Sequence, residues 1–281
     1  MKRIVPLLLA ACAALPAAAE DDFGIWTGVS VEKSITKKLS ADVSLGFRAE
    51  DKLQRVARWD IGAGVGYKPL KWLSISAGYT YIYGRNGQEA KTDYKNKLDD
   101  EGNPIFNGYN VDHGFWRNRH RATFDVTGKL SAGRWTFALR ERYQYTHYAA
   151  TSTLRDRYRS EIPAAQLASY TGDVYEWDGH SFARFTQTDN DKKAKDRHTL
   201  RSRLTVEYNI RHYPLTPYVS AELYNNFSEN MDLDKSRFMA GVEWKISKRH
   251  RLDFAYLFQN SSDDDNDGNL HAINIEYKFK F

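Results

Sequence analysis

The chain has 281 residues, of which 14% are aromatic and 27% are charged, and its formal net charge is +5. Its mean hydropathy is −0.67. The charge is nearly balanced and no basic block stands out, which argues against a nucleic-acid partner. Beyond residue 19, no apolar run is long enough for a transmembrane helix.

Residues 1–19 begin with two basic residues, continue with a short apolar run and end in three alanines. This pattern predicts a secretory signal peptide, leaving 20–281 as the mature domain. Leu9–Cys12 also matches a lipobox, in which Cys12 would be lipidated, and this alternative stays open. Cleavage after Ala19 would remove the only cysteine, so we expect no disulfide framework.

From residue 25 onwards, segments of about ten residues alternate apolar and polar side chains, the period of a strand with two different faces. Eleven such segments can be recognised: 25–31, 39–47, 59–67, 73–83, 116–130, 134–147, 200–210, 219–224, 238–246, 252–258 and 271–281. In 134–147, Glu141 falls on the apolar side, which predicts a bulge or a position above the membrane.

The connections between the segments alternate in length. Residues 68–71, 131–133 and 248–250 are tight turns, whereas about 85–115 and 149–196 are long and polar. This alternation is typical of barrels with short periplasmic turns and long extracellular loops. The fold class we predict is all-β, a single antiparallel transmembrane β-barrel of about ten to twelve strands. Eleven is an odd number, and single-chain bacterial barrels are even, so the strand count stays open within that range.

The last segment, 271–281, carries an apolar residue at every second position and ends on Phe281. Final strands of outer-membrane barrels have this form. We therefore expect the protein in the outer membrane of a Gram-negative bacterium, in contact with outer-membrane lipid and lipopolysaccharide. We also expect the outer-membrane insertion machinery to recognise it through Phe281.

Charged residues are concentrated on the predicted lumen face of the segments. The arginines and glutamates that we assign to the lumen are Arg117, Arg119, Arg121, Arg140, Arg142, Arg201, Arg203, Glu207, Glu222, Glu243 and Glu276. One interpretation is a salt-bridge network that fills a narrow barrel. The other is an arginine ladder that guides a small anionic solute through a pore.

An acidic run near the C-terminus matches the first half of a calcium loop, with Asp263, Asp265 and Asp267 as ligands. The twelfth position of such a loop needs a glutamate, and Asn274 stands there. This is a weak metal candidate beside the alternative of a solvated acidic loop. We predict no cofactor and assign no metal site.

The residues that could support catalysis are few. His147 has no serine at the spacing that outer-membrane phospholipases use, His180 and Ser181 are adjacent, and Asp112 and His113 form one neighbouring acid–imidazole pair. We assign no catalytic residue and lean against an enzyme. A hydrolase acting at the lipid interface remains one alternative. Another is surface recognition by the outer loops, using the aromatic residues Tyr170, Tyr175, Trp177 and Phe182.

Three short runs carry a family resemblance: 22–26, 58–60 and 115–121. Together they resemble an uncharacterised family of outer-membrane β-barrel proteins, common in Bacteroidetes and known only as a domain of unknown function. The resemblance implies a barrel and transfers no activity or site residue. The function we predict is that of an outer-membrane barrel with an arginine-rich lumen, acting as a narrow pore or as a structural or binding barrel.

Overall fold

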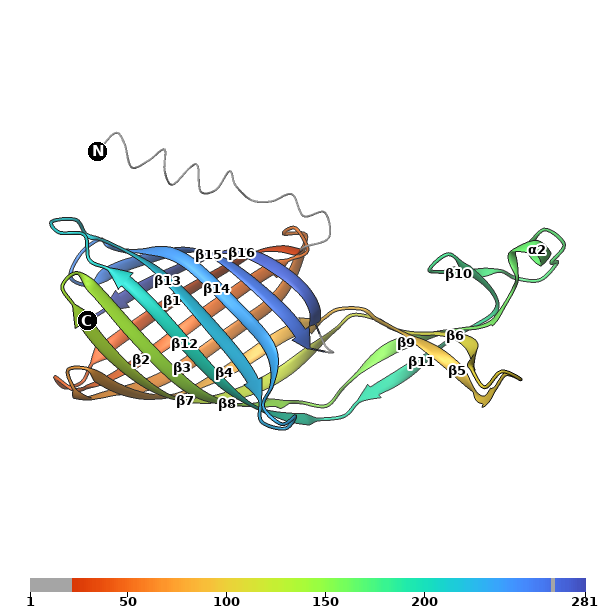
Figure 1. Cartoon of the computed structure of the whole chain (residues 1–281), viewed down its shortest axis with the longest axis horizontal. Helices are drawn as coiled ribbons and strands as arrows, with labels where there is room; N and C mark the ends of the chain where they lie inside the picture. The colour runs from red at the N-terminus through yellow and green to blue at the C-terminus, as the bar shows by residue number, and fades with distance from the viewer. Residues whose placement is uncertain (1–21, 264–265) are drawn as a thin grey trace, which may run out of the picture.

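A computed structural model describes residues 22–263 and 266–281 of the chain. These residues form a closed barrel and a second, five-stranded sheet that extends from one end of it (Figure 1). The one described helix is the short α2 (Ala164–Leu167). Among the described residues, no helix is long or apolar enough to span a bilayer.

Eleven of the described strands form the barrel wall, and each overlaps one of the alternating segments predicted from the sequence. Their bounds are β1 (Asp22–Ser34), β2 (Leu39–Glu50), β3 (Arg55–Leu70), β4 (Leu73–Asn86), β7 (Phe115–Ala132), β8 (Trp135–Tyr148), β12 (Lys195–Tyr208), β13 (Leu215–Asn226), β14 (Asp232–Lys245), β15 (His250–Asp263) and β16 (Asn266–Lys280). The predicted all-β barrel of about ten to twelve strands is therefore confirmed.

The barrel closes between its first and last strands. Every other neighbouring pair in the wall is antiparallel, but β1 and β16 pair in parallel, from Asp22 opposite Leu270 to Glu32 opposite Lys280. An odd number of strands that alternate in direction must meet once in parallel. The odd count is thus real, and the first segment is a full wall strand. Closure leaves neither β1 nor β16 with an unpaired edge.

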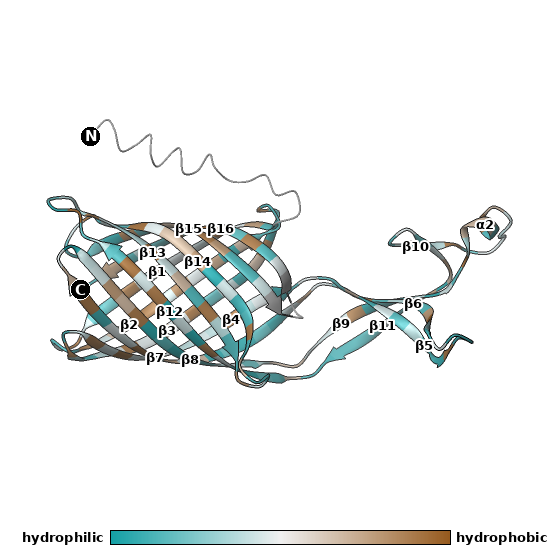
Figure 2. Ribbon diagram, in the orientation of Figure 1, coloured by the Kyte–Doolittle hydropathy of each residue, from teal (hydrophilic) through white to brown (hydrophobic). Residues whose placement is uncertain are grey.

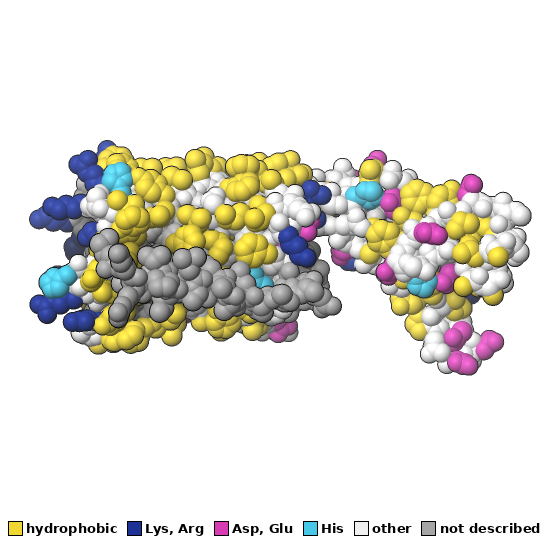
Figure 3. Space-filling view, turned by 90° about the horizontal axis from the view of Figure 1, so that it is seen from above, with side chains coloured by type: hydrophobic (Ala, Val, Ile, Leu, Met, Phe, Trp, Pro, Cys, Tyr) yellow, Lys and Arg dark blue, Asp and Glu magenta, His cyan; other side chains and the backbone are white. Residues whose placement is uncertain are grey.

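The outer face of the barrel is apolar. Exposed residues on it include Val43, Leu45, Ile61, Phe124, Leu139, Leu204, Val219 and Phe238. Apolar and polar residues alternate along the strands (Figure 2), and the apolar side chains cover much of the barrel surface (Figure 3). Lys and Arg side chains gather at the end opposite the extension, where the short turns lie (Figure 3). No bulge occurs at Glu141: its strand pairs regularly there, and the Ser202 hydroxyl donates a hydrogen bond to its carboxylate at 2.6 Å.

The five-stranded sheet, which we call the extension, is formed by the two long connections. Its strands are β5 (Glu89–Leu98), β6 (Pro104–Asp112), β9 (Thr151–Glu161), β10 (Tyr175–Trp177) and β11 (His180–Lys192), in the order β10-β11-β9-β6-β5. The regions expected as loops at about 85–115 and 149–196 are thus largely β-strand. Periodicity did not reveal these strands because the extension lies neither in a barrel wall nor between two layers, so most positions are polar.

A small aromatic cluster lies inside the extension. Phe182, Val111 and Tyr158 are buried, at 0%, 1% and 9% exposure. Phe106, Tyr109, Tyr175, Trp177 and Phe185 pack against them. Three of the four aromatic residues predicted for surface recognition therefore belong to this cluster or pack on it. Tyr170, the fourth, is exposed.

A charged cluster joins β6, β9 and β11 at the base of the extension. The Asp112 carboxylate accepts hydrogen bonds from Arg155 at 2.6 and 2.8 Å and from Lys192 at 2.6 Å. Burial acts to raise the pKa of Asp112, but the hydrogen bonds and charges of Arg155 and Lys192 outweigh it and lower the pKa to about 2. The carboxylate is therefore charged at neutral pH and links three strands.

Some predictions fall outside the described residues. The signal peptide and Cys12 belong to 1–21. The side chains of residues 262–267, which include Asp263, Asp265 and Asp267, are also outside the description. Among the residues that are described, no group of three or more His, Cys, Asp or Glu side chains could hold a metal ion.

Candidate functional site in the barrel lumen

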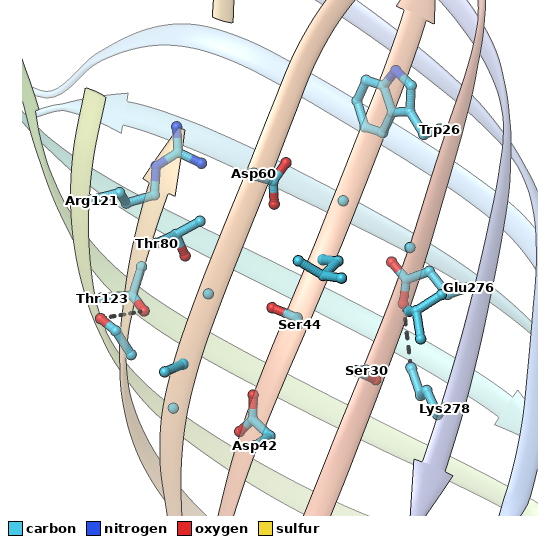
Figure 4. A pocket seen from close by; sticks show the side chains of 18 of the residues that line it. Trp26, Ser30, Asp42, Ser44, Asp60, Thr80, Arg121, Thr123, Glu276 and Lys278 are labelled. Carbon is cyan, nitrogen blue, oxygen red and sulfur yellow. Dashed lines mark hydrogen bonds and ion pairs between the residues drawn. The ribbon is translucent and has the colours of Figure 1, made fainter. Parts of the chain in front are cut away.

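Three cavities lined by described residues lie along the barrel lumen. One of about 310 Å³ is at the extension end, one of about 530 Å³ is in the middle, and one of about 320 Å³ is at the end where the chain terminates. We call them the outer, middle and inner cavities. Neighbouring cavities share lining residues, so they follow one another along the lumen. Figure 4 shows the middle cavity, with Trp26, Asp60 and Arg121 on its wall.

The lining charge changes along the lumen. The outer cavity is lined by ten Lys and Arg side chains and three carboxylates, and the middle cavity by nine and four. The inner cavity has four of each sign. Because a lumen surrounded by protein screens charge less than water does, an excess of this size produces a strongly positive potential. The potential is thus positive at the extension end and falls towards the inner end.

The boundary between the outer and middle cavities has an unusual composition. Six residues line both: Trp26, Arg48, Arg58, Arg121, Arg201 and Arg237. We call them the donor ring, because arginine and tryptophan side chains donate hydrogen bonds and have no acceptor. They come from β1, β2, β3, β7, β12 and β14, strands distributed around the whole wall. These donors therefore surround the boundary of the two cavities on several sides.

Glu222 anchors the arginines on one side of the ring. Its side chain is 1% exposed and forms ion pairs with Arg140 at 2.5 Å, Arg201 at 2.9 Å, Arg203 at 2.7 Å and Arg237 at 3.7 Å. One carboxylate cannot neutralise four guanidinium groups. The cluster is held together by Glu222 and still carries excess positive charge.

Two further carboxylates hold arginines elsewhere on the wall. Arg142 donates to both oxygens of Asp125, at 2.5 and 3.1 Å, in the two-pronged geometry that suits a guanidinium group. Arg58 donates from Nε to Asp60 at 2.8 Å. The sequence-based interpretation of a salt-bridge network thus describes the contacts of these residues. It does not account for the excess of arginine.

Arg48 and Arg121 are bound differently. The Arg48 guanidinium carbon lies 3.7 Å from the centroid of the Trp26 ring, a cation–π contact. Arg121 donates to the Thr146 hydroxyl at 3.4 Å. Within the part of the chain that the structure describes, neither arginine forms an ion pair with a carboxylate. Their charges contribute directly to the excess in the donor ring.

Trp26 is the remaining member of the ring. It is 5% exposed, it lines both cavities, and Arg237 also approaches its ring, at 4.9 Å. Its indole Nε1 is buried and has no hydrogen-bond partner among the described residues. Beside it, Leu257 and Ala272 form a small apolar cluster on the lumen wall. A buried hydrogen-bond donor without a partner destabilises a protein, so a hydrogen-bond acceptor beside Trp26 Nε1 would be stabilising.

The residues predicted for the lumen line different cavities, and two of them line none. Arg119, Arg121 and Arg201 line the outer cavity, and Arg121, Arg140, Arg142, Arg201, Arg203 and Glu276 line the middle one. Glu207, Glu243, Arg203 and Glu276 line the inner cavity. Glu222 is buried behind the arginines. Arg117 instead donates to the carbonyl oxygens of Ala149 and Lys193, at 2.7 and 2.5 Å, where the barrel meets the extension.

The sequence analysis missed four members of the donor ring. Arg48, Arg58 and Arg237 stand next to Phe47, Trp59 and Phe238, one position beyond the apolar residues that defined their segments. Continuing each alternation by one residue would have placed all three in the lumen. Trp26 was missed because a large aromatic residue on the polar face contradicts the expected pattern.

The histidines considered for catalysis each have a carboxylate partner. His113 contacts Asp156 at 2.7 Å, His147 contacts Asp196 at 2.7 Å, and His180 contacts Glu161 at 2.6 Å. Asp112, next to His113 in sequence, is bound to Arg155 and Lys192 instead. In the described part of the chain, no serine or threonine hydroxyl hydrogen-bonds to these three imidazoles.

Comparison with known proteins identifies a family and two similar folds. The chain is similar to the beta domain of the Bordetella autotransporter BrkA, with 10% identity and a TM-score of 0.42 over 85% of this chain and 78% of that one. It is also similar to the outer-membrane protease OmpT from Escherichia coli, with 10% identity and a TM-score of 0.41 over 82% and 80% of the two chains. No curated protein sequence matches. The model of a family described as "Protein of unknown function (DUF2490)" matches residues 23–269, and the chain belongs to that family.

Proposed function

We propose that this protein is an outer-membrane β-barrel whose lumen conducts small anions. The donor ring supports this most directly: five arginines and one indole line the boundary of two adjoining cavities and present donors only. Pores that select anions use rings of Arg or Lys. The apolar outer face fits a lipid environment, since a closed barrel satisfies its backbone groups internally.

The charge along the lumen also favours entry of anions at the extension end. We propose that the extension lies outside the cell and the short turns in the periplasm. The outer cavity, with ten basic side chains, would then concentrate anions from the medium, and the balanced inner cavity would release them. Strong binding at one end and weak binding at the other permits both entry and exit.

Single-channel recording in a planar bilayer tests the pore. The refolded mature chain should give steady current steps, and in a KCl gradient the reversal potential should show selectivity for chloride. Replacing Arg48 and Arg121 together by glutamine should move the reversal potential towards zero without leaving a carboxylate unpaired. A well-folded barrel that carries no current, or one that selects cations, would refute the proposal.

The other functions considered from the sequence have weaker support. A hydrolase at the lipid interface needs a nucleophile activated by a base, and the imidazole–carboxylate pairs described above have no serine or threonine bound to the imidazole. Surface recognition by the extension would rely on exposed residues such as Tyr94, Leu98 and Tyr170. Contacts with lipopolysaccharide and with the insertion machinery stay predictions from the sequence.

A further inference from the structure

We infer that the donor ring is a discrete binding site for a compact oxyanion of two or more negative charges, such as phosphate or sulfate. This inference rests on the proposed anion-conducting lumen and names the solute class that the lumen would take. It distinguishes one localised site from a general positive potential, which would attract every anion equally.

The chemistry of the ring favours oxyanions over halides. A guanidinium group is a planar fork whose N–H groups match two oxygen atoms of a phosphate or carboxylate, whereas a halide offers a single centre. Five such forks and one indole N–H adjoin the same two cavities. A tetrahedral oxyanion has enough acceptor lone pairs to bind several of these donors at once.

The charge of the ring favours a ligand with more than one negative charge. Of its five arginines, Arg58 pairs with Asp60, and Arg201 and Arg237 share Glu222. Arg48 and Arg121 form no carboxylate ion pair within the described residues. Cations held close together in a low-dielectric interior repel one another, and a multiply charged anion between them relieves that repulsion.

Trp26 provides an independent indication of a ligand. Its buried Nε1 has no hydrogen-bond partner among the described residues, although buried polar groups nearly always have one. Its ring is held in place by Arg48 on one strand and approached by Arg237 on another. A donor fixed among arginines at the boundary of two cavities is suited to an anionic oxygen.

The same phosphate chemistry could belong to a free solute or to a lipid headgroup. The barrel wall favours the free solute. All eleven described wall strands are hydrogen-bonded to a neighbour on each side, including the parallel pair β1 and β16. A lipid therefore has no lateral entrance to the ring, whereas a free oxyanion can enter from the end of the lumen.

Isothermal titration calorimetry on the refolded mature chain in detergent tests the site with inorganic phosphate and, separately, chloride. We expect saturable binding of one phosphate per barrel and much weaker binding of chloride. R48Q and R121Q should each weaken phosphate binding by about tenfold or more, the size of a lost charge-assisted hydrogen bond. W26F keeps the aromatic ring and the net charge and removes only the N–H, and it should also weaken binding by about tenfold.

The matched control is R85Q. Arg85 lines the outer cavity but is not part of the donor ring, so R85Q removes the same charge and should change the affinity by no more than about twofold. Equal effects of R48Q and R85Q, or no effect of W26F in a folded barrel, would refute a discrete site. Displacement of phosphate by short-chain phosphatidic acid would refute the inference that the ligand is a free solute and not a lipid headgroup. Circular dichroism of each variant checks that it folds.

The two proposals fail in different ways. Anion-selective current without saturable phosphate binding would refute the binding site and leave the proposal of an anion-conducting pore intact. Phosphate binding that depends on the ring, in a barrel without current, would support the site and refute the pore.

Discussion

Arg48 and Trp26 are directly opposite each other on β2 and β1, and the guanidinium group of Arg48 stacks on the Trp26 indole 3.7 Å from the ring centroid. The contact fixes an arginine that no carboxylate holds within the described residues. It also buries a large aromatic side chain inside the barrel. The pair thus serves both the stability of the barrel and the geometry of the donor ring.

This relationship predicts different outcomes for two substitutions. Trp26→Ala removes the ring under Arg48 and leaves a void beside Leu257, so the free energy of unfolding should fall by about 3–5 kcal/mol. Trp26→Phe preserves an aromatic face, so the free energy of unfolding should fall much less, by about 1–2 kcal/mol. Urea unfolding in lipid or detergent, followed by tryptophan fluorescence, measures both. Equal loss in the two variants would contradict the role of the stacked pair.

Glu222 should be more important for stability than any other lumen glutamate. Glu222→Gln leaves four guanidinium groups without their shared carboxylate, and breaking such a buried network costs about 3–5 kcal/mol. Glu207→Gln is the control, since Glu207 lines the inner cavity and forms no ion pair with a described residue. Its effect should stay within about 0.5 kcal/mol. Similar urea midpoints for both variants would show that the network does not stabilise the barrel.

The parallel closure can be tested by a disulfide. Val29 and Tyr277 are register partners on β1 and β16, so cysteines at both positions, in a chain carrying Cys12→Ala, should cross-link on oxidation. The control places the cysteines at Val29 and Phe254. Phe254 lies on β15, one strand further away, roughly 10 Å from β1 and beyond disulfide reach. Mass spectrometry distinguishes the two. Cross-linking of the control pair alone would mean that β1 does not close the barrel by pairing with β16.

The base of the extension should resist acid. The folded pKa of Asp112 is about 2, below its ordinary value of 3.8, so its stabilising effect is present above about pH 4 and is lost only as the pH falls through 2. This shift corresponds to roughly 2 kcal/mol. Asp112→Asn should therefore raise hydrogen exchange in β6, β9 and β11 at neutral pH. Asp189→Asn, at an exposed position of β11, should not. Exchange that is unchanged by Asp112→Asn would refute the link.

The barrel strands were predictable because a barrel wall imposes the same two environments on every strand. An apolar outer face and a polar lumen face produce a strict alternation, as in 59–67 and 238–246. The extension has no such pair of environments. Its strands are stabilised by neighbours far away in sequence, such as Tyr158 beside Tyr109 and Phe185. No local sequence pattern therefore predicts these strands.

The sequence by itself determined the fold class, the wall strands and the charge of the lumen face, because each depends on the period of neighbouring residues along one strand. The tertiary structure decided the parallel closure of β1 on β16, since the pairing of chain ends is not encoded in local periodicity. It also decided the donor ring. Trp26, Arg48 and Arg237 come from separate strands, and only the stagger of a closed barrel brings them to one level of the lumen.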